Sequence, residues 1–305
     1  MAKSHLSVRD ALLALAIVFV WGTNFVVIRW GLDALPPLFF ATLRFSLVFV
    51  PAGLFLKRPR RGDGTFVPWG NLAIYGVSIG LFQFGMLFIA MKGHISPGLA
   101  SLVVQMQVFF TIGLSMLRSG EKLAPHRLAA FALALAGMGV IAAHNGEGAT
   151  LGGVALVLVA AMGWAFGNTA SREAGASNML AYVVWAALFS IPPLAILSLL
   201  LEGPAAIAAG LAKASVLTWA AVLWQSVGNT MFGYASWAWL ISRYPAATIA
   251  PMSLLVPIFG FGASALLLGE PLPLWKIGAT LLIMAGLAVN LLWRPRKRTV
   301  EGEPC

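Results

Sequence analysis

Polar side chains inside long apolar runs are the residues with which this chain could bind a small polar ligand, because charge is almost absent from those runs. Arg44 is the only charged residue well inside one of them, seven residues from Pro37 and so about 10 Å from the end of a helix. Its guanidinium could bind helix-end carbonyls or reach the lipid headgroups. It could also pair with a ligand carboxylate in a cavity. The sequence leaves both alternatives open.

A Trp and an Asn lie close together near the start of each half of the chain. Trp21 and Asn24 are three residues apart on one helical face, and Trp164 and Asn168 are four apart in the second half. An amide both donates and accepts hydrogen bonds, which suits a ligand that carries an ammonium and a carboxylate. The asparagines are therefore predicted to bind ligand, whereas helix packing is the competing interpretation and is favoured for the tryptophan rings.

A polar stripe marks the apolar segment 214–240. Gln225, Asn229, Phe232 and Ser236 follow one another at i, i+4, i+7 and i+11, so they share one face of a regular helix. Such a face is predicted to line the interior or a wet cavity.

Two further segments carry glutamines that could reach the same cavity. Segment 69–91 places Gln83 on a face with Tyr75, Phe82 and Met86. In segment 97–117, Gln105 and Gln107 are two residues apart and point about 200° from each other. Gln105 is the one we expect in the cavity, together with Ser101.

These residues must be positioned by membrane-spanning helices. The chain has 305 residues, of which 60% are hydrophobic and 10% charged, with a mean hydropathy of +0.88. Soluble domains carry about 25% charged residues. Apolar runs of roughly 20 residues predict an all-α integral membrane protein with ten spans. The expected spans are 11–29, 37–56, 69–91, 97–117, 126–143, 150–171, 179–201, 214–240, 246–268 and 274–293.

The distribution of basic residues predicts the orientation of the spans. With the N-terminus in the cytoplasm, fifteen of the twenty Lys and Arg residues fall in cytoplasmic segments and four in outer loops. Both termini are therefore expected in the cytoplasm. The net charge of +10 is explained by this topology, and no nucleic-acid partner is expected because the basic residues are divided among short loops.

The two halves of the chain resemble each other. One offset of 149 residues places Gly120-Glu121 on Gly269-Glu270 and Gly137 on Gly286. The predicted units are residues 8–145 and 150–294, with five spans each, followed by a basic cytoplasmic tail at 295–305. Because five is odd, the second half must cross the membrane in the opposite direction to the first. This inverted-repeat plan places a binding site between the halves, near the middle of the bilayer.

Several stretches resemble the EamA family of the drug/metabolite transporter superfamily, and within it the bacterial exporters of O-acetylserine and cysteine. These stretches are Trp21 to Ile28, Leu43 to Phe45, Gly98 to Thr111, Trp164 to Asn168 and Pro251 to Glu270. The resemblance implies a multi-pass protein of the bacterial inner membrane that exports amino acids or related small metabolites by alternating access. Export of other neutral or aromatic amino acids or metabolites is the alternative within the same class.

Other classes of function receive less support from the residues. The histidines are scattered, no phosphate-binding P-loop occurs, and no cluster of His, Asp, Glu or Ser marks one membrane face. We therefore expect no metal, no cofactor and no enzymatic activity; an integral membrane enzyme and a purely structural subunit are the weaker alternatives. The expected partners are a small-molecule substrate and lipid, and small residues around Gly137, Gly139 and Gly286 permit close helix packing within the chain or in a homodimer.

Overall fold

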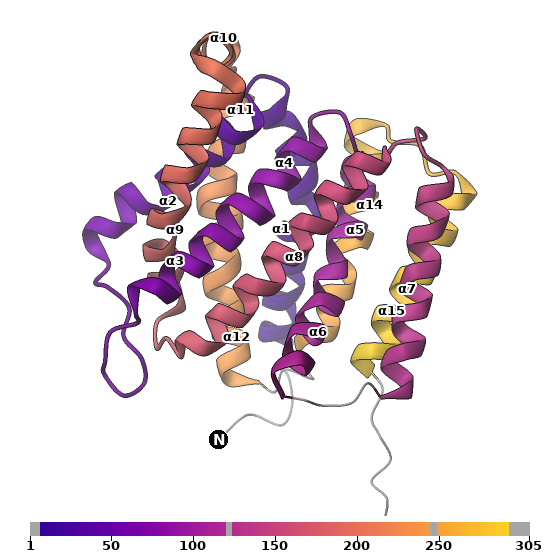
Figure 1. Ribbon diagram of the computed structural model, residues 1–305, viewed down its shortest axis with the longest axis horizontal. Coiled ribbons are helices and arrows are strands. Elements are labelled where there is room, and N and C mark those ends of the chain that lie inside the picture. Colours follow the sequence, from indigo (N-terminus) through magenta and orange to yellow (C-terminus); the bar gives the residue numbers. More distant parts are fainter. Residues whose placement is uncertain (1–6, 120–123, 245–248, 293–305) are drawn as a thin grey trace, which may run out of the picture.

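The computed structural model describes residues 7–119, 124–244 and 249–292, and these residues form a bundle of long helices (Figure 1). The repeat residues Gly120 and Glu121 and the tail 295–305 lie outside the described residues. In the described part, nine helical segments are long and apolar enough to cross a membrane. They are Val8–Leu32, Pro37–Phe55, Trp69–Met91, Pro97–Leu117, Pro125–Ala143, Leu151–Ala174, Met179–Lys213, Pro251–Leu268 and Leu274–Leu292.

Most of these segments are single α-helices. They are α1 (Val8–Leu32), α2 (Pro37–Phe55), α7 (Pro125–Ala143), α8 (Leu151–Ala174) and α15 (Leu274–Leu292). Others contain a change of helix type. These are α3 (Trp69–Val77), η1 (Ser78–Gly85) and α4 (Met86–Met91); α5 (Pro97–Val103), η2 (Val104–Met106) and α6 (Gln107–Ser119); α9 (Met179–Leu197), η3 (Ser198–Glu202) and α10 (Gly203–Lys213); and η5 (Ala250–Leu254) and α14 (Leu255–Leu268).

The segment expected to be the eighth span is helical from Val216 to Arg243, as α11 (Val216–Leu223), η4 (Trp224–Gly233) and α12 (Tyr234–Arg243). It is not among the nine candidates. The segment carries the polar residues Gln225, Asn229 and Thr230, all buried in the bundle. The seventh span, expected to end at residue 201, ends at Glu202. Gly203 has φ 80°, which interrupts the helix, and α10 then projects from one end of the bundle (Figure 1).

Helix ends follow local sequence signals. The Thr150 and Asn178 side chains accept hydrogen bonds from backbone N–H groups in the first turns of α8 and α9. Proline occupies the first turn of α2, α5 and α7, where its missing N–H costs nothing. Gly175 ends α8 with φ 55°, a left-handed conformation that favours glycine.

Helix pairing follows the same pattern in the two halves. α1 packs against α14 and η4, while α8 packs against α5, α6 and η1. α2 packs against α9, and α7 packs against α15 at the side of the bundle (Figure 1). At the last pair, a Cβ on Gly137 would lie 2.9 Å from the Ala279 carbonyl oxygen, and one on Gly286 would lie 2.5 Å from the Ala130 oxygen. These glycines therefore serve helix packing within the chain.

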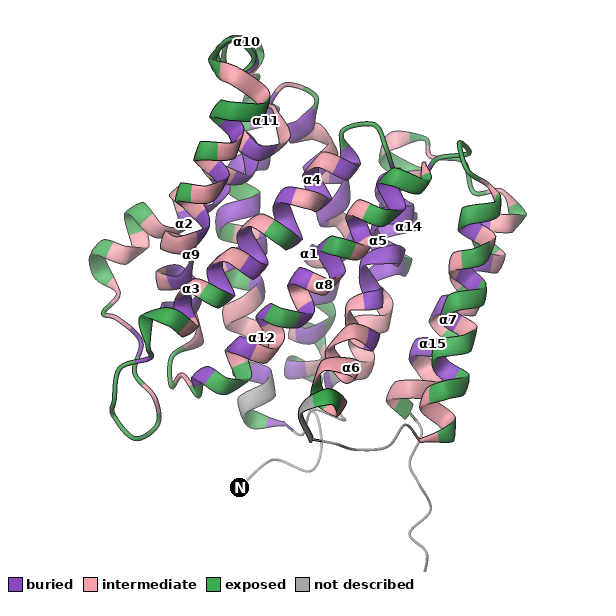
Figure 2. Ribbon diagram, in the orientation of Figure 1, coloured by how far each residue is buried: buried purple, intermediate pink, exposed green. Residues whose placement is uncertain are grey.

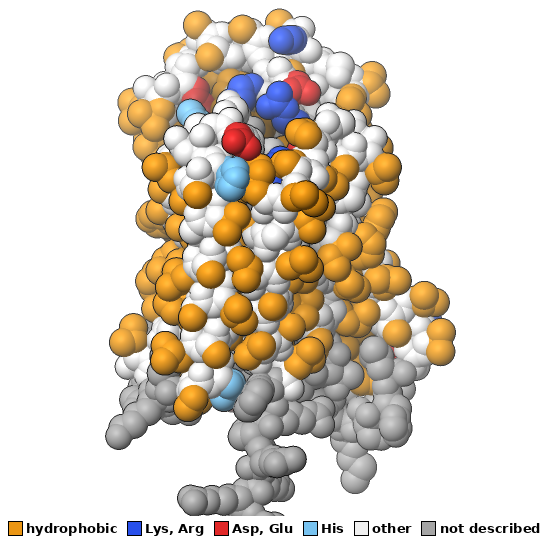
Figure 3. Space-filling view, turned by 90° about the vertical axis from the view of Figure 1, so that its right-hand side faces the viewer, with side chains coloured by type: hydrophobic (Ala, Val, Ile, Leu, Met, Phe, Trp, Pro, Cys, Tyr) orange, Lys and Arg blue, Asp and Glu red, His pale blue; other side chains and the backbone are white. Residues whose placement is uncertain are grey.

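Burial is highest along the middle of the bundle, and exposed residues lie on its outward faces (Figure 2). The view from the side of α7 and α15 shows hydrophobic side chains over the middle of the molecule (Figure 3). Charged side chains gather at the end from which α10 projects, called here the α10 end. An apolar belt with charge beyond it is the surface expected of a protein embedded in a bilayer.

Candidate functional site

A cavity of about 40 Å³ lies between helices of the two halves. The sequence offers nine candidate site residues: Trp21, Asn24, Arg44, Gln83, Gln105, Trp164, Asn168, Gln225 and Asn229. Five of them line this cavity, and they come from α1, η1, α8 and η4. They are Trp21, Asn24, Gln83, Trp164 and Asn229. Phe25, Phe84 and Tyr234 complete much of the wall, so the cavity is largely aromatic with a few amide groups.

Arg44 is fully buried beside this cavity, in a second one of about 10 Å³ that shares Phe84 and Tyr234 with it. Its Nη1 donates to Gln225 Oε1 at 2.6 Å, and its Nη2 and Nε donate to Thr230 Oγ1 at 2.8 and 3.2 Å. The guanidinium also lies 3.5 Å from the centroid of the Phe84 ring. The side chain therefore points into the interior and not toward helix-end carbonyls or the membrane surface.

The Arg44 cation has no carboxylate partner among the described residues. Each of its hydrogen-bond acceptors is neutral, one an amide and the other a hydroxyl. Burying a charge without a counter-ion is costly, so such groups are normally paired. A guanidinium has five N–H donors, and the three bonds above leave two of them free. The site can therefore accept an anionic group.

Gln225 connects Arg44 to Asn24. Its Nε2 donates to Asn24 Oδ1 at 2.6 Å, while its Oε1 accepts from Arg44 and, at 3.4 Å, from Asn24 Nδ2. One amide of η4 thus joins two helices of the first half, α1 and α2. The network Asn24–Gln225–Arg44–Thr230 is buried throughout.

Gln83 supplies an unused acceptor to the cavity. Its side chain is buried, and its Oε1 has no hydrogen-bond partner among the described residues. Tyr234 lines the same cavity. A buried acceptor without a partner costs about 1–3 kcal/mol, and a ligand that donates a hydrogen bond to it would recover this energy.

Trp21 packs against other aromatic side chains as well as lining the cavity. The Trp21 ring lies 5.7 Å from Tyr234 and 5.2 Å from Trp237, centroid to centroid. A Cβ on Gly233 would come within 2.5 Å of Trp21 Nε1, so the missing side chain at Gly233 makes room for the indole. The Trp21 ring therefore both packs between helices and lines the cavity.

The other two predicted residues lie away from the cavity. Gln105 is buried, and its Nε2 donates to the Ser253 backbone oxygen in η5 at 3.2 Å. Asn168 donates from Nδ2 to Gln107 Oε1 at 3.0 Å, which joins α8 to α6. Gln105 and Gln107 thus serve different helix contacts, as their spacing on the helix requires. Ser101, expected beside Gln105, donates to the Gly98 oxygen at 2.7 Å.

Thr230 is the site residue that the sequence reasoning missed, because η4 is a π-helix and not an α-helix. The Thr230 hydroxyl donates to the backbone oxygen of Gln225, five residues earlier, at 2.8 Å. The wider turn changes the phase of the expected stripe, so Phe232 is partly exposed while Thr230 faces Arg44. The pattern Gly-x-x-x-Phe-Gly occurs at 80–85 in η1 and again at 228–233 in η4, and this recurrence was a signal that the two segments are equivalent.

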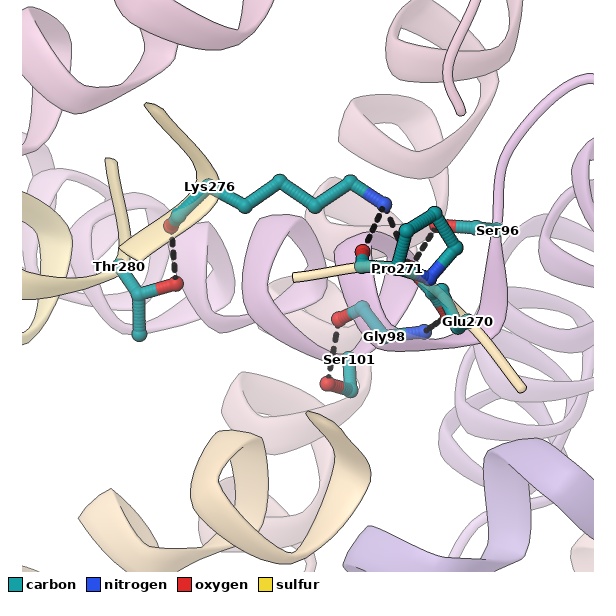
Figure 4. Close-up of polar contacts among 7 residues, drawn as sticks. All are labelled: Ser96, Gly98, Ser101, Glu270, Pro271, Lys276 and Thr280. Carbon is teal, nitrogen blue, oxygen red and sulfur yellow. Dashed lines mark hydrogen bonds and ion pairs between the residues drawn. The ribbon is translucent and has the colours of Figure 1, made fainter. Parts of the chain in front are cut away.

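A larger cavity of about 560 Å³ opens at the α10 end, near the N-terminus of α5. Glu270 lies in its wall and accepts hydrogen bonds from Gly98 N, at 3.0 Å, and from the Ser96 hydroxyl (Figure 4). Lys276 forms a buried ion pair with Glu270, 3.0 Å from Nζ to Oε1. The hydrogen bonds of Glu270 tie the loop between α14 and α15 to the start of α5, and the ion pair ties the same loop to α15.

The described residues contain no group of three or more His, Cys, Asp or Glu side chains that could hold a metal ion.

Comparisons with known proteins identify the family. The model of the EamA-like transporter family matches residues 9–143 and 151–292. A "Probable amino-acid metabolite efflux pump" of Salmonella typhimurium strain LT2 is 41% identical over 97% of this chain and 99% of its own length. The protein of the same name from Escherichia coli K12 is 40% identical over 95% and 98%.

More distant similarity extends over the whole bundle. A "Probable terminal-alkyne amino-acid exporter" of Streptantibioticus cattleyicolor is 26% identical over 93% of this chain and 95% of its own. One solved structure, titled only "Crystal structure of protein", superposes with a TM-score of 0.62 at 20% identity, covering 97% of this chain and 99% of that one. It shares the fold. The chain belongs to the EamA-like transporter family.

Proposed function

We propose that this protein is a secondary transporter that exports amino acids or closely related metabolites across the bacterial inner membrane by alternating access. The family and the names of the similar efflux pumps and exporters support export of small metabolites. The central cavity supports a zwitterionic substrate in particular. The observation that carries this proposal is Arg44, a fully buried cation whose acceptors are neutral.

The substrate carboxylate is proposed to bind Arg44. A carboxylate accepts two parallel N–H bonds from a guanidinium, which supplies both the missing counter-ion and a fixed orientation. Arg44 lies where two cavities meet at Phe84 and Tyr234, so a ligand bound to it would extend toward the aromatic cavity.

The substrate ammonium is proposed to bind the amide oxygens across that cavity. Gln83 Oε1 is buried and without a partner among the described residues, and Asn229 and Asn24 line the same space. An ammonium has three donors and no acceptor, so it suits these oxygens.

Substrate entry must enlarge the site. Ligand pockets usually have roughly 300–1,000 Å³, whereas the two cavities here have about 40 and 10 Å³. The described arrangement is therefore a closed one. Gln225 Oε1 takes one of the two N–H donors of Arg44 Nη1, so a carboxylate that pairs with Nη1 meets this amide oxygen. We propose that the substrate displaces Gln225, which releases η4 from α1 and α2 and allows the halves to move apart.

The proposed architecture is ten spans in two inverted five-helix repeats, residues 8–145 and 150–294, with both termini in the cytoplasm. The matching helix pairings and the two π-helical segments with the pattern Gly-x-x-x-Phe-Gly support a duplicated bundle. The count of fifteen basic residues against four supports the orientation.

Cysteine and O-acetylserine are the proposed substrates through the family resemblance. Neutral or aromatic amino acids are the second candidate, and the aromatic wall formed by Trp21, Phe25, Phe84, Trp164 and Tyr234 favours them. A zwitterion with an apolar side chain would contact these rings without leaving a polar group unpaired.

Reconstitution of the purified protein in liposomes tests the proposal. Labelled cysteine, O-acetylserine and a panel of neutral and aromatic amino acids are supplied, and flux and product identity are followed. Saturable flux of unchanged solute is expected. Chemical conversion of the solute would indicate an enzyme, and absence of flux for every zwitterion would refute the proposed function.

A further inference from the structure

We propose that the loop at residues 56–68, between α2 and α3, binds the phosphate of an anionic phospholipid through Arg58 and Arg60. This loop lies at the end of the bundle opposite α10, on the side of the N-terminus (Figure 1). The inference is independent of the transported solute and rests on the geometry of the loop.

Two guanidinium groups converge on one aromatic ring in this loop. The Cζ atoms of Arg58 and Arg60 lie 5.0 and 4.3 Å from the centroid of Phe66. Arg58 also lies 4.0 Å from the centroid of Trp69, at the start of α3. Two cations that share one ring repel each other unless an anion lies between or beside them. The arrangement is therefore one that a phosphate would stabilise.

Neither guanidinium is neutralised by another described residue. Arg58 Nη2 donates to the Val67 oxygen at 2.6 Å, and Arg60 Nη1 donates to the Gly64 oxygen at 3.0 Å, both of which are backbone carbonyls. Arg58 Nε is buried and has no hydrogen-bond partner in the described part of the chain. No carboxylate of a described residue pairs with either side chain. Free N–H donors on two adjacent arginines match the oxygens of a phosphate.

The nearest acid in the loop is directed elsewhere. Asp63 Oδ1 accepts from the backbone N of Thr65 at 2.9 Å and from its hydroxyl at 2.6 Å. These hydrogen bonds lower the pKa of the Asp63 carboxyl, so it stays ionised in the turn. The loop at residues 56–68 contains one acid, Asp63, and four basic residues, so its formal charge is +3. The four are Lys57, Arg58, Arg60 and Arg61.

Hydrogen bonds to the end of α8 and to the residues that follow it hold the loop in place. Arg61 Nε donates to the Ala174 oxygen at 3.2 Å, and the Ser177 backbone N and hydroxyl both donate to the Arg60 oxygen, at 2.9 and 3.0 Å. Because the backbone is fixed at Arg60 and Arg61, little order has to be gained when a ligand binds.

Exposed apolar side chains beside the arginines favour a lipid over a free phosphate. Leu54 and Phe55 end α2 with 80% and 84% of their surface exposed, and Phe66 and Trp69 are also exposed. A phospholipid presents its phosphate to the arginines and its glycerol and acyl carbons to these side chains. Basic segments next to a membrane span attract anionic lipid headgroups on the cytoplasmic side.

Native mass spectrometry of the full-length protein with phosphatidylglycerol, phosphatidylcholine or glycerol phosphate tests the proposal, with melting temperature as a second readout. The test variant is R58Q/R60Q. The matched control is R29Q/K213Q, which removes two basic side chains at the α10 end. Each cation near an anionic surface contributes roughly fivefold to binding, so we expect the test variant to bind phosphatidylglycerol about 25-fold more weakly. The control should bind it like the unmodified protein.

Phosphatidylglycerol is expected to raise the melting temperature of the protein and the control, and phosphatidylcholine is not. If R58Q/R60Q does not fold, the single variant R60Q at the exposed arginine replaces it, with an expected loss of about fivefold. Unchanged phosphatidylglycerol binding in the arginine variants would overturn the proposal. Equal stabilisation by glycerol phosphate would also overturn it, because the site would then take a soluble phosphate.

Discussion

Replacing Gln225 by glutamate tests whether this side chain occupies the substrate's place on Arg44. In the closed arrangement Gln225 Oε1 lies 2.6 Å from Arg44 Nη1. A carboxylate of nearly the same shape would form an ion pair there and give the buried cation its counter-ion. We therefore expect Q225E to fold with a melting temperature equal to or above that of the unmodified protein.

The expected change in half-saturation concentration follows from the ion pair between Arg44 and the introduced glutamate, which substrate binding would have to break. Separating a buried ion pair leaves one charge uncompensated and costs about 3–5 kcal/mol. In Q225E the substrate must displace the introduced carboxylate from Arg44, so the half-saturation concentration should rise about a hundredfold or more. Uptake of labelled cysteine or another transported amino acid into liposomes measures this change.

Gln225→Leu is the matched control, since it removes the acceptor without adding charge. It leaves Arg44 Nη1 without a partner in the empty protein, at a cost of about 1–3 kcal/mol. Substrate should then raise the melting temperature more than it does in the unmodified protein. Transport by Q225E with an unchanged half-saturation concentration would refute the idea that Gln225 and the substrate compete.

Three further outcomes are expected. Arg44→Lys should lower transport by about tenfold or more at an unchanged fold, because one ammonium cannot make the paired contacts of a guanidinium; liposome uptake and circular dichroism measure the two quantities. Glu270→Gln should lower the free energy of unfolding by about 3–5 kcal/mol, since it leaves the Lys276 ammonium buried without a carboxylate, and Lys276→Met in the same chain should restore part of the loss in a thermal melt. Single cysteines introduced at Lys57 and Lys213, in a chain without Cys305, should react with impermeant reagents from opposite sides of the membrane, and labelling from one side only would contradict the proposed orientation.

The elements of the bundle could largely be predicted from the sequence because the bilayer imposes length and composition on them. Nine expected spans correspond to nine long apolar helices in the described residues. The seventh span was expected to end at residue 201, and it ends at Glu202. The role of Glu202 was not predicted: its carboxylate accepts from Leu38 N and Phe39 N, at 2.6 and 3.0 Å, and caps α2. A contact between residues so far apart in the chain leaves no periodic signal in the sequence.

The site could be predicted in part. Buried polar residues in apolar spans were the useful signal, and it found Asn24, Arg44 and Gln225, which the structure joins in one network. It did not find Thr230, because a 3.6-residue period does not describe a π-helix. It also could not show that Asn24 lines the cavity while Asn168 does not. The Asn168 amide instead joins α8 to α6.

Recognition of the substrate carboxylate is the central claim, and transport of carboxyl-blocked analogues tests it most directly. Uptake of a transported amino acid, its methyl ester and its decarboxylated amine is measured in liposomes with the unmodified protein. We expect saturable uptake of the amino acid. Neither analogue should be taken up, and neither should compete with the amino acid. Transport of the ester or the amine at the rate of the acid would contradict it.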